Sequence, residues 1–90
     1  MSVRREFEGG KYYIAAIPMA EKAGYGIIYG IVPWADQYME ALYNFLNDEV
    51  WGQGYIIRFF DIAHLEVGGT HCVMILGIIQ RKTLWDRIRY

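Results

Sequence analysis

The chain has 90 residues, of which 54% are hydrophobic and 17% aromatic, and its formal net charge is −1. This length corresponds to one domain, and the apolar content excludes an intrinsically disordered chain. Cys72 is the only cysteine, which excludes a disulfide within the chain and fits a cytoplasmic protein, and no apolar run reaches the roughly 18–20 residues of a membrane-spanning helix.

The first predicted elements follow a polar N-terminal arm. Residues 1–10 end in Gly9-Gly10 and are predicted to be loose. Residues 11–19 and 25–32 are rich in β-branched and aromatic residues, and they predict two strands joined by a loop over residues 20–24. Gly30, inside the second of these strands, indicates a bulge or the close approach of another backbone.

A long helix is predicted over residues 34–49. The apolar residues at helical spacing predict a stripe that should face a sheet. They are Met39, Leu42, Tyr43, Leu46 and Val50, and Tyr38 and Phe45 widen the stripe. Pro33 suits the entrance of this helix and Gly52 its end. A second, short helix is predicted over residues 83–90.

Residues 55–67 and 70–82 predict a second hairpin around Gly68-Gly69, a favourable two-residue turn. This turn places Val67 opposite Thr70 and Phe60 opposite Gly77, where an aromatic ring can cover the bare glycine backbone. The element order therefore predicts a single α+β domain over residues 1–90. Its antiparallel four-stranded sheet (β-β-α-β-β) carries the long helix on one face, and a ferredoxin-like arrangement is the alternative.

The second hairpin has apolar residues on both of its faces. One helix of this length covers only one face of a four-stranded sheet, and large exposed apolar patches usually mark interfaces. The sequence therefore predicts a homo-oligomer whose sheets pack face to face or join into a larger barrel. The alternative is a monomer whose terminal segments fold over the second face of the sheet.

The segment HLEVGGTH, residues 64–71, has the most chemically suggestive side chains in the chain. In the predicted register His64, Glu66 and His71 lie on one face, with Glu66 opposite His71. Two histidines and a carboxylate can bind zinc or iron, and a His–Glu pair can perform acid–base chemistry. An ordinary polar hairpin tip explains the same residues. The sequence identifies no cofactor.

Four other residues are candidates for a catalytic or ligand-binding role. Asp61 lies in an apolar strand; burial would raise its pKa and make it, with His64, a candidate acid or base. Arg58 could pair with it across an interface or hold an anionic ligand. Trp34 and Trp51 flank the long helix and could wall a ligand pocket or cap the core.

Basic residues concentrate near the two ends of the chain. A basic surface there could contact single-stranded nucleic acid, with tyrosines stacking on bases. The middle of the chain is acidic, however, and disfavours such a partner. The candidate contact residues are Arg4, Arg5, Arg81, Lys82, Arg87 and Arg89.

These observations favour a small binding or regulatory protein without enzymatic activity. It would act as a homo-oligomer through an apolar sheet face and its basic termini. The alternatives are a metal-binding protein or enzyme that uses the His64, Glu66 and His71 cluster, and a single-stranded nucleic-acid binder. Whether the chain is an enzyme stays open.

Overall fold

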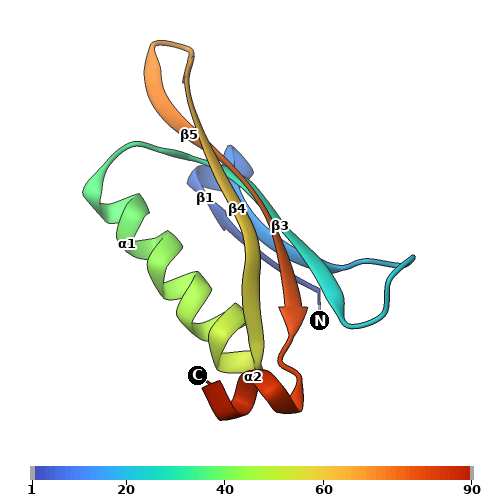
Figure 1. The fold of residues 1–90 in the computed structure, drawn as a ribbon. Coiled ribbons are helices and arrows are strands. Elements are labelled where there is room, and N and C mark those ends of the chain that lie inside the picture. Colours follow the sequence, from blue (N-terminus) through green and yellow to red (C-terminus); the bar gives the residue numbers. More distant parts are fainter. Residues whose placement is uncertain (1, 90) are drawn as a thin grey trace.

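A computed structural model describes residues 2–89, apart from the side chains of Asp86, Arg87 and Arg89. The chain forms one antiparallel sheet of five strands in the order β1-β2-β3-β5-β4 (Figure 1). The strands are β1 (Val3–Phe7), β2 (Tyr12–Pro18), β3 (Tyr25–Pro33), β4 (Tyr55–Val67) and β5 (Thr70–Arg81).

The prediction of a four-stranded sheet is wrong, because part of the supposed loose arm is strand β1. Val3, Arg5 and Phe7 alternate toward the helix side of the sheet, and β1 pairs along β2. The ferredoxin-like alternative is also wrong, since three antiparallel strands precede the long helix and two follow it.

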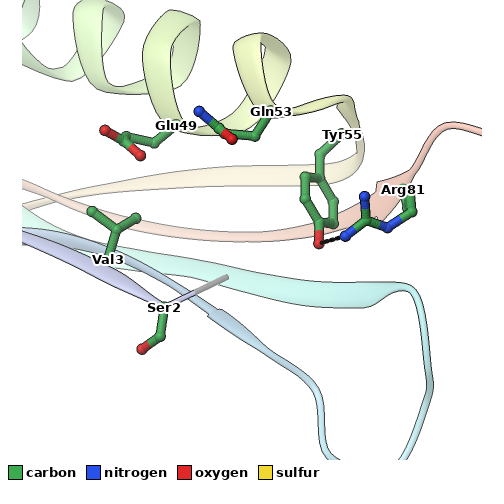
Figure 2. Close-up of a pocket in the computed structure, with 6 residues that line it drawn as sticks. All are labelled: Ser2, Val3, Glu49, Gln53, Tyr55 and Arg81. Atoms are coloured by element: carbon green, nitrogen blue, oxygen red, sulfur yellow. Dashed lines mark hydrogen bonds between the residues drawn. The ribbon is translucent and has the colours of Figure 1, made fainter.

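The predicted long helix is confirmed, with later bounds than expected. Helix α1 (Asp36–Phe45) continues into a π-helical turn (Leu46–Val50) and a 3-10 turn (Trp51–Gln53), and Gly54 ends this segment in a left-handed conformation. Figure 2 shows Glu49 and Gln53 at its end, above the start of β1. The Tyr38 hydroxyl donates a 2.7 Å hydrogen bond to Glu8, which joins α1 to the β1–β2 connection.

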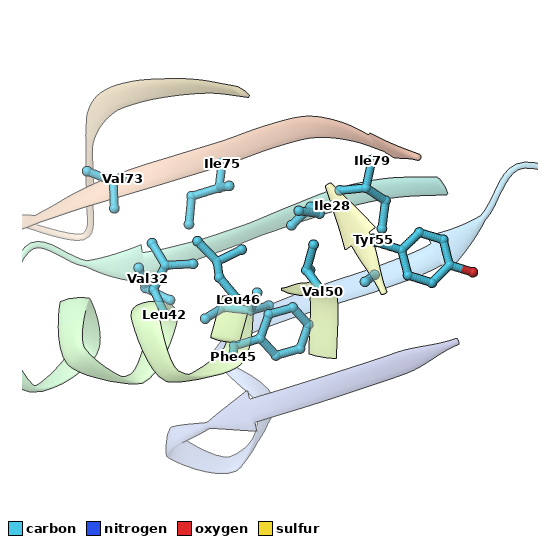
Figure 3. Close-up of a cluster of buried hydrophobic side chains, with 12 residues drawn as sticks. Ile28, Val32, Leu42, Phe45, Leu46, Val50, Tyr55, Val73, Ile75 and Ile79 are labelled. Carbon is cyan, nitrogen blue, oxygen red and sulfur yellow. The ribbon is translucent and has the colours of Figure 1, made fainter. Parts of the chain in front are cut away.

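The core lies between this helical segment and one face of the sheet (Figure 3). Leu42, Phe45 and Val50 point from the helical segment onto the strands, as the apolar stripe predicts. Tyr43, expected in the same stripe, is exposed instead. The sheet side of the core comprises Ile14, Ala16, Ile28, Val32, Tyr55, Val73, Ile75 and Ile79.

The second hairpin has the predicted register over most of its length. Gly68 and Gly69 both have positive φ, as a tight turn of this kind requires, and Val67 pairs with Thr70. Phe60 pairs with Gly77, and the residues between follow the prediction. A bulge between Ile57 and Phe59 shifts the pairing of β4 before it, so Arg58 does not oppose Ile79.

The predicted C-terminal helix is present as α2 (Leu84–Arg89). Figure 1 shows it where β5 ends, beside the end of the long helical segment. None of the helices within residues 2–89 combines the length and apolarity needed to cross a membrane.

Candidate functional site

Within residues 2–89, no helix packs on the sheet face opposite α1 (Figure 1). Side chains of successive residues in a strand point to opposite faces, so the residues that alternate with the core residues along each strand point to this face. We call it the open face. Its apolar residues include Tyr13, Ala15, Ile17, Tyr25, Ile27, Tyr29, Ile31, Phe59, Ala63, Leu65, Met74, Leu76 and Ile78.

The open face exposes large apolar side chains near its middle. Met74 and Leu76 are each 51% exposed, and Phe59 is 49% exposed. The rings of Tyr13 and Tyr29 meet edge to face, with their centroids 5.9 Å apart. Such a continuous patch is larger than the scattered apolar residues of an ordinary monomer surface.

The charged residues of the strands themselves that lie on the open face belong to the two edge strands, β1 and β4. On β1, the Arg4 guanidinium lies 4.1 Å from the Tyr13 ring centroid and donates a 2.9 Å hydrogen bond to Glu6. That bond to the Glu6 carboxylate raises the pKa of Arg4. On β4, at the opposite edge, Asp61 pairs with Leu76 and is exposed.

One row of paired residues connects these two edges across all five strands. We call it the central row, and it consists of Arg4, Ala15, Tyr29, Leu76 and Asp61. It has a cation at one end, an anion at the other and apolar residues between them.

The predicted approach of His64 to His71 is present on the helix side of the β4–β5 hairpin. His64 Nδ1 and His71 Nε2 are 2.9 Å apart. The Trp34 ring packs on both imidazoles, at 5.1 Å and 6.2 Å between centroids, and its backbone N–H donates to the His71 carbonyl. Register and packing thus hold both rings at one place on the surface.

Glu66 pairs with His71 as predicted, and it lines the same shallow surface pocket as the two histidines. Among the side chains that the structure describes, however, no three His, Cys, Asp or Glu residues are arranged to hold a metal ion. The observed geometry therefore brings together two imidazoles rather than a three-ligand set.

The buried acid expected at Asp61 is not found. Asp61 is exposed because β4 is an edge strand and nothing covers the open face. Arg58 lies at the bulge, and its Nε donates a 2.6 Å hydrogen bond to Gln80.

The two tryptophans that flank the long helix do not form one pocket. Trp34 precedes the helical segment and contacts the histidines, whereas Trp51 lies at its other end beside Tyr43. Some 15 helical residues span about 22 Å, which separates the two rings widely. Trp51 instead lines a surface pocket with Ile56, Ile57 and Lys82.

The described basic residues near the two ends of the chain do not all lie on one face of the sheet. Arg4 and Arg5 point to opposite faces of the sheet, and each lies beside a glutamate, Glu6 and Glu49 respectively. Arg81 donates a 2.9 Å hydrogen bond to the Tyr55 hydroxyl (Figure 2). The predicted contacts by the Arg87 and Arg89 side chains lie outside the described residues.

Arg4 is the residue whose place on the sheet surface was not predicted. The signal was the alternation of Val3, Arg5 and Phe7 with Arg4 and Glu6, which is typical of a strand with one polar side.

Comparison with family models, with curated proteins and with solved structures gives no match.

Proposed function

We propose that this chain is a non-enzymatic binding or regulatory protein that works as a homo-oligomer through its open face. The observation that carries the proposal is the uncovered apolar surface centred on Met74 and Leu76. A domain of this size buries only a modest core, and association is a common way for such a domain to gain stability.

The polar groups inside the domain are satisfied. In residues 2–89, every described buried side-chain nitrogen or oxygen atom has a hydrogen-bond partner, as is usual for a folded core. Cys72 is buried and free, which is compatible with the cytoplasmic location that we propose.

Replacing Leu76 with glutamate should dissociate the oligomer. The new carboxylate would lie at the centre of the buried contact without a partner, and leaving such a charge uncompensated is costly. We expect light scattering to give a multiple of 10.5 kDa for the wild-type chain and 10.5 kDa for Leu76→Glu.

The matched control is Tyr43→Glu, because Tyr43 is exposed on the helix, away from the open face. This variant should form an oligomer with the same number of chains as the wild type. Self-association through the open face would be contradicted if the wild-type chain stayed monomeric at all accessible concentrations. It would also be contradicted if Leu76→Glu left the mass of a wild-type oligomer unchanged.

A second candidate function is metal binding by His64 and His71. Their nitrogens are 2.9 Å apart, and a small shift of the rings would give the roughly 3.3 Å that separates two imidazole nitrogens bound tetrahedrally to one ion at about 2.0–2.1 Å. Both rings are exposed, so an ion can approach the two facing nitrogens from solvent. Solvent or Glu66 would complete the coordination.

Elemental analysis of the purified, untagged protein tests this candidate. We expect stoichiometric zinc or another transition metal, with a loss of affinity of about tenfold or more in His71→Ala because a direct ligand is removed. Val67→Ala, at the same hairpin tip, is the control. Metal-free protein that also fails to bind added Zn²⁺ would leave the histidines as a polar hairpin tip.

A further inference from the structure

We infer that the partner of the open face is a second copy of this chain, stacked face to face about a twofold axis that runs parallel to the strands over β3. This inference rests on the proposed function and adds to it the geometry of the contact. It is carried by the central row, from Arg4 to Asp61.

A twofold axis parallel to the strands reverses the strand order of the second sheet. Strand β1 of one copy then lies over β4 of the other, and β2 lies over β5, while each row of paired residues stacks on itself. Arg4 therefore faces Asp61 of the second copy, and by symmetry Asp61 faces the second Arg4. Both ends of the central row find the opposite charge.

The other in-plane twofold axis gives a less favourable contact. An axis along the central row would stack β1 on β1 and β4 on β4, so that Arg4 faces Arg4 and Asp61 faces Asp61. Like charges across an interface are unfavourable and select against that orientation. Charge complementarity thus chooses between the two ways of stacking this face on itself.

The apolar part of the row is also self-complementary in size. In the proposed orientation Ala15, the smallest side chain of the row, faces the protruding Leu76, and Tyr29 lies beside its own symmetry mate. The neighbouring row places Ile17 opposite Ile78 in the same way. Small against large is the pattern that lets two apolar layers interdigitate.

The sheet twist does not remove the ionic contacts. Packed sheets cross at about 30°, and the ends of the row lie about 10 Å from the axis, since adjacent strands are about 4.8 Å apart. The resulting offset of about 5 Å is within the reach of an arginine side chain. Glu6 accepts a hydrogen bond from one N–H of the Arg4 guanidinium, which has five N–H donors in all, so donors remain for Asp61 of the second copy.

Two single charge reversals and their mixture test this geometry. Arg4→Asp places two acidic residues opposite each other, and Asp61→Arg places two arginines opposite each other. We expect Arg4→Asp to weaken the homodimer by at least about tenfold in Kd, and Asp61→Arg by somewhat less, because Glu6 remains beside Arg4. Sedimentation velocity over a concentration series measures both values.

The equimolar mixture of the two variant chains is the decisive sample. In the mixed dimer, each of the two charge contacts at positions 4 and 61 joins an acidic residue to an arginine. A one-to-one heterodimer should therefore form at concentrations where neither variant self-associates. Native mass spectrometry distinguishes the heterodimer from both homodimers by mass. Glu40→Arg, an exposed acidic position on α1 on the other side of the sheet, is the matched control and should leave the homodimer unchanged.

The outcomes separate this inference from the proposed function. A dimer that Leu76→Glu dissociates, but that survives both charge reversals without preferring the mixed pair, keeps the open face as the interface and overturns the orientation. A dimer insensitive to all three substitutions places the contact elsewhere, for example on the β4 edge, and overturns both. A wild-type chain that never associates also overturns both.

Discussion

Replacing Phe45 with alanine should lower the free energy of unfolding by about 3–5 kcal/mol. The side chain is fully buried at 0% exposure, where the helical segment meets the sheet (Figure 3). Truncation removes the transfer free energy of the ring and leaves a cavity that the surrounding strands cannot fill completely. The Arg5 guanidinium, 5.5 Å from the ring centroid, also loses its aromatic neighbour.

This loss would be a large share of the total stability. A domain of this length has a free energy of unfolding of roughly 5–13 kcal/mol. We expect urea denaturation followed by circular dichroism to show a markedly lower midpoint, or an unfolded chain if the wild type is near the lower limit. Protein concentration must be equal in all samples, because association stabilises the folded state.

Tyr43→Ala is the control for the loss of an aromatic ring from the same helix. Tyr43 is 61% exposed, so its removal should change the free energy of unfolding by about 1 kcal/mol or less. Equal costs for the two substitutions would mean that the helical segment does not pack on the sheet as described.

The β4–β5 hairpin shows where sequence reasoning succeeds. A two-residue Gly-Gly turn fixes the register locally, and each following pair is determined by it. The bulge before Phe59 was not predicted, because no Gly or Pro marks it: the flanking residues are Ile57 and Arg58. The error is confined to the residues beyond the bulge.

Strand β1 was missed because its composition is that of a polar arm. Arg5 occupies a position on the helix side of the sheet, where an apolar residue is expected. It is accommodated there because its guanidinium lies over the Phe45 ring and within 3.6 Å of Glu49. Long-range contacts of this kind cannot be read from a local pattern, and an edge strand of five residues gives a weak pattern in any case.

The same distinction explains the candidate site. The meeting of His64 with His71 follows from the hairpin register and could be predicted. The exposure of Asp61 depends on the lateral position of β4 in the sheet, which no local signal specifies. The opposition of Arg4 and Asp61 at the two edges of one row required the full strand order.

Replacing Gly30 with alanine should cost about 1–3 kcal/mol of unfolding free energy, since overpacking forces neighbouring atoms apart. The sequence indicates a bulge or a close backbone approach here, and the structure has the approach. A Cβ at this position would collide with the Tyr13 carbonyl oxygen and lie 2.9 Å from Ile14 Cα. Both atoms are backbone of β2, so relief requires β2 and β3 to separate.

That separation would affect both sides of the sheet at once. Gly30 pairs with Ile14 in β2 and with Ile75 in β5, and both partners belong to the core. Strand β3, which carries Tyr29 and Ile31 of the open face, would move as well. Gly30→Ala should therefore weaken self-association in addition to lowering the urea midpoint. Sedimentation and denaturation of one preparation would measure both effects.

Gly9→Ala provides the contrast that identifies the cause. Gly9 has φ of +69°, and no atom lies within 4 Å of the position that a Cβ would take, so alanine there incurs backbone strain of about 1 kcal/mol without a collision. It lies outside the open face and should leave association unchanged. If Gly30→Ala proved as mild as Gly9→Ala in both measurements, the β2 and β3 backbones would not be as close as the fold requires, and the stacking of β2 on β5 across the proposed dimer would lose its basis.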